Sequence, residues 1–183
     1  VIVKINDIVQ TSQQNLISLV PELQLFVKSS KWSKEIQDYF LSYLCSEQTH
    51  AKRLNTLFSD PSLFQECVPL IAYHERLESF IIIYVDKQQI APEPGEPGSV
   101  LSYFRSYGYE DNVLNSDCYG QLSCSSCSIE IHNGSPENPN PRDEEFDMLD
   151  IDTEKPATSC SRLSCHTIVG HSPLIITIRK PVC

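Results

Sequence analysis

Hydrophobic residues in the first third of the chain recur at the three- and four-residue spacing of α-helices. Behind Ser33, a residue type that often caps helices, five of them share one face: Ile36, Tyr39, Phe40, Tyr43 and Leu44. The pair Asp60-Pro61 has the form of a cap followed by proline at the first helical position. A further helix is predicted near residues 16–23, provided that it begins at Pro21. We therefore predict a small all-helical region over residues 1–76.

The pattern changes to that of strands from about residue 77. Strands are predicted at Phe80–Val85, Ser128–His132 and Leu174–Ile178, and a short helix after the cap Ser99 ends at Gly108. Between residues 91 and 98, three prolines exclude a central strand. Strands first and last, with a helix between them, predict an α+β domain over residues 77–183 in which a helix packs across a small sheet.

Composition and charge narrow the classes of function. The chain has 183 residues, and its 40% hydrophobic content suits a packed core. Of the net charge of −10, residues 77–183 carry −9, with 7 Lys and Arg against 16 Asp and Glu. This acidic part argues against nucleic acid and favours a basic protein partner, unless it serves only solubility. The longest apolar run, Phe80–Val85, is too short to span a membrane, so no spanning segment is expected.

The eight cysteines are distributed unevenly. Five of them lie between residues 118 and 165, whereas Cys45, Cys67 and Cys183 are scattered. Small disulfide-rich proteins are shorter and denser in cysteine than this chain. A metal centre therefore explains the grouping better than a disulfide framework does. The five histidines are scattered and are interpreted as surface or packing residues rather than as ligands.

Three of the grouped cysteines form the pattern C-x5-C-x2-C, at Cys118, Cys124 and Cys127, and Cys165 follows after 37 intervening residues. A loop with three thiolates and a fourth from elsewhere in the fold is what a two-iron, two-sulfide cluster requires. Small residues such as Gly120 would let backbone N–H groups approach its sulfurs. A zinc site formed by Cys124, Cys127, Cys160 and Cys165 is an alternative, although it leaves Cys118 without a role.

Three segments together resemble the adrenodoxin-type [2Fe–2S] ferredoxins of mitochondria and bacteria. They are the cysteine loop Cys118–Cys127, the acidic segment Asp143–Asp150 and the run Ser161–Cys165, and the resemblance covers about residues 77–181. It implies a β-grasp ferredoxin fold, a [2Fe–2S] cluster and one-electron transfer at low potential. It also implies that Cys118, Cys124, Cys127 and Cys165 are the cluster ligands. Cys160, five residues before Cys165, is the alternative fourth ligand, and the match of the run Ser161–Cys165 to the family favours Cys165.

The same resemblance implies that the acidic segment is a surface that contacts other proteins. Glu144, Glu145, Asp147 and Asp150 match the residues that meet basic reductases and electron acceptors in this family. The alternative is a solvated helix whose first-turn acids stabilise the helix dipole. The chain also departs from the family at Ser128, where animal adrenodoxins often carry a histidine that ties the cluster loop to the acidic region.

Two functions are compatible with these features, and neither is that of an enzyme. The helical extension would serve as a docking region if the chain is an accessory subunit of a mitochondrial, respiratory-chain complex, with a local redox or structural role for the cluster. The alternative is a soluble one-electron carrier between a flavin reductase and haem monooxygenases, haem-synthesis enzymes or iron–sulfur assembly enzymes. In eukaryotes the resemblance implies a location in the mitochondrial matrix or on the matrix side of the inner membrane. Because the chain starts at Val1 and its only methionine is Met148, we expect the translation start, and any removed targeting peptide, to lie upstream.

Overall fold

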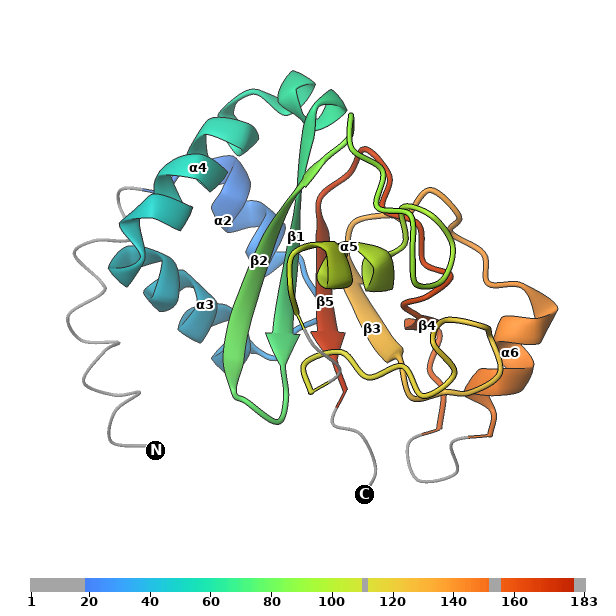
Figure 1. The fold of residues 1–183 in the computed structure, drawn as a ribbon. Helices are drawn as coiled ribbons and strands as arrows, with labels where there is room; N and C mark the ends of the chain where they lie inside the picture. The colour runs from blue at the N-terminus through green and yellow to red at the C-terminus, as the bar shows by residue number, and fades with distance from the viewer. Residues whose placement is uncertain (1–18, 110–111, 152–155, 180–183) are drawn as a thin grey trace. The chain divides into compact units, whose positions relative to one another are not determined.

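The computed structural model describes residues 19–109, 112–151 and 156–179 (Figure 1). The chain divides into two compact units, with the boundary in the sequence between Leu63 and Phe64. The predictions for residues 1–18, including the helix start near Leu16, lie outside the described residues. Among the described residues, no helix is long and apolar enough to cross a membrane.

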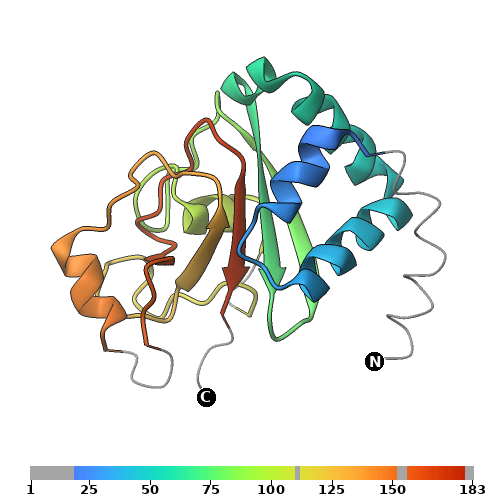
Figure 2. The same cartoon turned by 180° about the vertical axis from the view of Figure 1, so that it is seen from behind.

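The first unit consists of helices. They are α2 (Pro21–Lys28), α3 (Lys34–Ser46) and α4 (Gln48–Ser59), followed by the 3₁₀ helix η2 (Pro61–Gln65), and the three α-helices pack on one another (Figure 2). The predicted cap is confirmed, since the Ser33 hydroxyl accepts the Ile36 N–H at 3.4 Å. The helix α2 begins at Pro21, as predicted. Large apolar side chains with no exposed surface lie on these helices: Leu23, Val27, Phe40, Leu44 and Leu54.

The second unit contains a five-stranded mixed sheet. Its strands are β1 (Cys67–His74), β2 (Ser79–Asp86), β3 (Ser128–Asn133), β4 (Ser161–Leu163) and β5 (Leu174–Ile178), in the order β2-β1-β5-β3-β4. Only β1 and β5 are parallel, and the other neighbours are antiparallel. The helix α5 (Val100–Ser106) lies across one face, and α6 (Asp143–Leu149) lies beyond β4 in both views (Figures 1 and 2). This topology confirms the predicted α+β class and its β-grasp arrangement.

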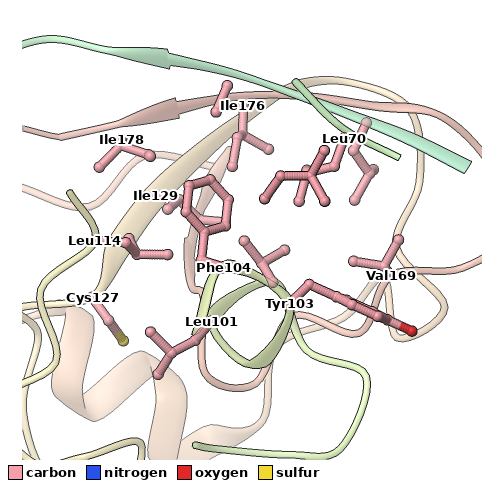
Figure 3. Close-up of a cluster of buried hydrophobic side chains, with 14 of the residues drawn as sticks. Leu70, Leu101, Tyr103, Phe104, Leu114, Cys127, Ile129, Val169, Ile176 and Ile178 are labelled. Carbon is pink, nitrogen blue, oxygen red and sulfur yellow. The ribbon is translucent and has the colours of Figure 1, made fainter. Parts of the chain in front are cut away.

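The core of the second unit lies between α5 and the sheet. Leu101 and Phe104 of α5 face Ile129, Ile176 and other strand residues, and all of these side chains are completely buried (Figure 3). The predicted start of this helix is confirmed, because the Ser99 hydroxyl accepts the Ser102 N–H at 3.2 Å. The predicted strands at residues 80–85, 128–132 and 174–178 are present with slightly different ends.

The boundary predicted after residue 76 is wrong, because residues 67–74 form strand β1 instead of continuing the helical region. The eight residues of β1 pair with β2, so residues 76 and 77 lie in the turn of a hairpin. Most of β1 is buried, which removes the alternation of polar and apolar residues that identifies a strand in sequence. Pro69 is tolerated because the pairing of β1 with β5 starts only at Leu70. The sequence interpretation also missed β4, which has only three residues.

Candidate metal centre

The loop between α5 and β3 brings together the first cysteines of the predicted set. Three residues within four positions have positive φ: Tyr119 at 53°, Gly120 at 80° and Leu122 at 54°. These left-handed conformations turn the chain back on itself just after Cys118. The Cys118 carbonyl then accepts the Gln121 N–H at 3.2 Å, which closes the turn. This tight winding carries Cys124 back toward Cys118.

Cys127 and Cys165 come from different segments that the sheet places side by side. Cys127 directly precedes β3, Cys165 follows β4 by two residues, and these two strands are paired. The Ser164 N–H donates to the Cys127 carbonyl at 3.1 Å. Both cysteine side chains are fully buried, whereas Cys118 and Cys124 are half-buried.

The four thiols form two interacting pairs, and in each pair the pKa of one thiol is lowered. A hydrogen bond from the Cys165 thiol, opposed by burial, lowers the pKa of Cys127 to about 7, and the same bond raises the pKa of Cys165. Burial acts to raise the pKa of Cys118, but bonds from Ser123 and the Cys124 thiol outweigh it and lower that pKa. Burial raises the pKa of Cys124. Thiolates are the form that binds metal, so the four sulfurs are a suitable donor set.

Cys160 belongs to neither pair. Its sulfur lies 3.9 Å from the Ser159 hydroxyl, and its backbone carbonyl accepts the Ile131 N–H. Within the described residues, no group of three or more His, Cys, Asp or Glu side chains is arranged to hold a metal ion. A two-iron cluster needs two thiolates on each iron rather than four around one point. The pairs therefore fit a binuclear cluster better than the alternative zinc site built with Cys160.

Two glycines allow the backbone to pack closely around the pairs. Gly95, in the proline-rich segment, has φ of +84°, and a Cβ atom there would lie 2.6 Å from the Cys165 carbonyl oxygen. A Cβ atom on Gly120 would lie 2.4 Å from the Gly95 nitrogen. The Glu96 N–H also donates to the Cys165 carbonyl at 2.8 Å. The sequence interpretation identified Gly120 but missed Gly95, whose contacts depend on a segment 70 residues away.

Replacing Gly120 with alanine is expected to cost at least about 2 kcal/mol more than the same change at Gly108. Both glycines have φ near +80°, so both variants strain the backbone, but nothing lies within 4 Å of a Cβ atom on Gly108. The difference between the variants therefore isolates the close contact of Gly120 with Gly95. Urea unfolding followed by circular dichroism measures both, and equal losses of stability would contradict the packing described here.

Comparisons with known proteins give a likeness of fold only. No protein-family model matches the chain, and no curated protein matches it either. A ferredoxin from Rhodopseudomonas palustris HaA2 aligns at 17% identity and a TM-score of 0.47, covering 63% of this chain and 99% of that one. An ISC-like [2Fe–2S] ferredoxin from Pseudomonas putida JCM 20004 aligns at 20% identity and 0.47, covering 63% and 96%. A covalent putidaredoxin reductase–putidaredoxin complex aligns at 20% identity and 0.44, covering 60% and 96%. Because all of these values are low, the interpretation of the site rests on this chain's own cysteines.

The acidic segment forms helix α6, and the four predicted contact residues differ in their exposure to solvent. Glu144, Asp147 and Asp150 are exposed. Glu145 has no exposed surface, so the prediction that it contacts a partner is wrong. It accepts the Leu163 N–H at 2.7 Å and two N–H groups of Arg162, at 2.8 and 3.1 Å. Glu145 therefore holds α6 against β4.

The Glu145–Arg162 pair also connects the acidic helix to the segment that carries Cys165. Arg162 is 4% exposed, and it donates a further hydrogen bond to the Asn138 carbonyl at 2.8 Å. This ion pair joins α6 to β4, two residues before Ser164 and three before Cys165. The signal was present in the sequence, since both residues lie in the motifs that carry the resemblance. The sequence did not show that these two residues, which are 17 positions apart, contact each other.

Proposed function

We propose that this chain is a [2Fe–2S] ferredoxin-like protein built into a mitochondrial, respiratory-chain complex as an accessory subunit. The observation that carries the proposal is the assembly of four thiols into two pairs. Cys118 and Cys124 would hold one iron, and Cys127 and Cys165 the other. When bound, such a cluster accepts and passes on one electron.

The protein's own groups prepare this centre. The Ser126 hydroxyl lies 3.2 Å from the Cys124 sulfur, and donation from it would stabilise negative charge there. Cys127 and Cys165 have no exposed surface, so the fold keeps water away from that pair. Cys118 and Cys124 are half-buried, which makes their side of the site the more accessible one for electron exchange. The role that this arrangement of thiols supports is electron transfer through a bound cluster.

The role of accessory subunit is supported by the first unit of the chain. The described residues up to Leu63 belong to a compact helical unit of their own, and all four cysteines of the site lie in the other unit. A carrier that only shuttles electrons gains little from such a unit, whereas a resident subunit needs docking surface. We place the protein in the mitochondrial matrix or on the matrix side of the inner membrane, on the strength of the sequence resemblance.

A soluble carrier is the second candidate, and the exposed acids of α6 favour it. Glu144, Asp147 and Asp150 present carboxylates to solvent, as expected for recognition of basic redox partners. Such a carrier would accept electrons from a flavin reductase and deliver them to haem monooxygenases, haem-synthesis enzymes or iron–sulfur assembly enzymes. In that case, replacing the three acids with their amides should weaken reductase binding at low salt.

Electron paramagnetic resonance before and after dithionite reduction tests the cluster. We expect a signal only after reduction, together with about two irons and two acid-labile sulfides per chain. A single zinc ion, or no bound metal in protein isolated anaerobically from its source, would contradict the proposal. Iron and sulfide must be quantified on the sample used for the spectra.

Gel filtration of a detergent-solubilised native mitochondrial extract separates the two roles. An accessory subunit is expected to elute with a complex many times larger than its own 20.7 kDa. Elution near the mass of the single chain would contradict the subunit role and support the carrier. Recombinant chain added to a separate aliquot serves as the control for adventitious association.

A further inference from the structure

Two buried serine hydroxyls lie beside the cysteine pair Cys127 and Cys165. They belong to Ser128, the residue after Cys127, and to Ser164, the residue before Cys165. Neither hydroxyl makes a hydrogen bond of ordinary geometry with the described residues. Buried hydroxyls without partners are uncommon in native proteins, so each of them needs an explanation. For Ser164 the surrounding structure supplies one.

The backbone of Ser164 is held on both sides. Its N–H donates to the Cys127 carbonyl at 3.1 Å, and its carbonyl accepts the Leu101 N–H of α5 at 3.1 Å. The residue has no exposed surface. Because the backbone is fixed and water is excluded, the hydroxyl of Ser164 has to donate its hydrogen to a group inside the protein.

The Cys127 sulfur is the group on which this hydroxyl acts. The Cys165 thiol has the largest effect in lowering the pKa of Cys127, and the Ser164 hydroxyl lowers it further. Cysteines bind iron as thiolates, so the Cys165 thiol loses its hydrogen, and with it this hydrogen bond, when metal is bound. The Ser164 hydroxyl keeps its hydrogen and remains a donor beside the Cys127 sulfur.

We propose that Ser164 raises the reduction potential of the metal centre by donating its hydroxyl hydrogen to the Cys127 sulfur. This inference rests on the proposed function, because it requires a cluster held by Cys127. Reduction adds one negative charge to the centre, and a hydrogen-bond donor at a ligand sulfur stabilises the more negative state. Removal of the hydroxyl should therefore make the centre harder to reduce.

Burial makes Ser164 a stronger donor to this centre than Ser126. The Ser126 hydroxyl lies 3.2 Å from the Cys124 sulfur and accepts the Asp117 N–H at 2.9 Å. Because Ser126 and Cys124 are half-buried, a water molecule can replace that hydroxyl as the donor. Ser164 and Cys127 have no exposed surface, so water cannot replace the donor there, and the low local dielectric strengthens its hydrogen bond.

A redox titration of the full-length Ser164→Ala protein, followed by the paramagnetic signal of its reduced state, tests the proposal. We expect the equilibrium between the two states to shift about three- to tenfold toward the oxidised one, and tenfold corresponds to about 59 mV for one electron. Alanine removes only a hydroxyl that makes no ordinary hydrogen bond, so the fold and the iron content should be unchanged. An unchanged potential at unchanged iron content would overturn the proposal.

The matched control is Thr167→Val, which removes another completely buried hydroxyl two residues after Cys165. The Thr167 hydroxyl donates to the Leu163 carbonyl at 2.8 Å, so its hydrogen is directed at oxygen and not at sulfur. This variant should leave the equilibrium within about twofold of the unaltered protein. A shift as large as that of Ser164→Ala would mean that the potential responds to any loosening of this segment, which would also overturn the proposal.

The same samples distinguish failure of this inference from failure of the proposed function. If the unaltered protein contains no iron and gives no signal on reduction, both are contradicted. If it contains the cluster and Ser164→Ala leaves the potential unchanged, only the role of Ser164 is contradicted. Ser164→Gly provides a second protein without the hydroxyl, and it should shift the equilibrium in the same direction as Ser164→Ala. Shifts of opposite sign in the two variants would attribute the effect to packing and overturn the proposal.

Discussion

Replacing Cys165 with serine is expected to abolish the reduced-state paramagnetic signal of the protein, whereas replacing Cys160 leaves it intact. Cys165 is fully buried and interacts with Cys127, which makes it one half of a thiol pair. Cys160 lies five residues earlier, and its sulfur is 3.9 Å from the Ser159 hydroxyl, outside both thiol pairs. A serine hydroxyl is a much poorer iron ligand than a thiolate, so only the first variant should lose the cluster.

The comparison needs evidence that both variants fold. Far-ultraviolet circular dichroism should be the same for the two proteins after anaerobic purification, with iron quantified in each. Retention of the signal in Cys165→Ser together with its loss in Cys160→Ser would make Cys160 the fourth ligand. It would also show that the segment around β4 rearranges when the metal binds, because Cys160 precedes this strand.

Replacing Arg162 with alanine is expected to destabilise the second unit by about 3–5 kcal/mol, because it leaves the Glu145 carboxylate buried and largely uncompensated. Glu145 accepts two hydrogen bonds from Arg162 and one from the Leu163 backbone N–H, so the variant removes the two charged ones. The matched control is Glu144→Gln, which alters the exposed neighbour on the same helix and should change stability by less than about 0.5 kcal/mol. Urea unfolding of the full-length protein measures both variants.

A double variant distinguishes the ion pair from simple loss of packing. Replacing Arg162 and Glu145 together with leucine removes both charges and keeps an apolar contact between α6 and β4. We expect it to be clearly more stable than Arg162→Ala, since replacing a whole buried pair is often nearly neutral. If the double variant is less stable than Arg162→Ala, the bonds from Arg162 to the Asn138 region and from Leu163 to Glu145 matter more than the charge pair itself.

The buried position of Glu145 also changes how the acidic helix should be tested. A variant of Glu145 would lower partner binding by loosening α6, and this effect could be mistaken for loss of a direct contact. Glu144, Asp147 and Asp150 are exposed, so their amide variants report on recognition without disturbing the core. Stability therefore has to be measured beside binding for every variant of this helix.

Local patterns were sufficient to predict most of the individual elements. The helix behind Ser33 and the helix behind Ser99 follow from a capping residue and the apolar spacing after it, both of which act within one or two turns. Strands β2, β3 and β5 follow from short apolar runs bounded by turn residues. The predictions failed at β1 and β4, which are identified by the strands that pair with them and not by a pattern of their own.

Local sequence was enough to predict which residues form the metal centre, because the spacing of Cys118, Cys124 and Cys127 is a property of one short loop and the fourth cysteine lies in a recognisable run. Tertiary structure alone decided how these residues are used. Pairing of β3 with β4 sets Cys127 beside Cys165, and close packing of the proline-rich segment requires glycine at Gly95. Tertiary structure also buried Glu145 while it left the acidic neighbours of this residue exposed. Burial and pairing depend on segments far apart in the chain, and a carboxylate in a charged run looks the same in sequence whether it faces water or a buried arginine.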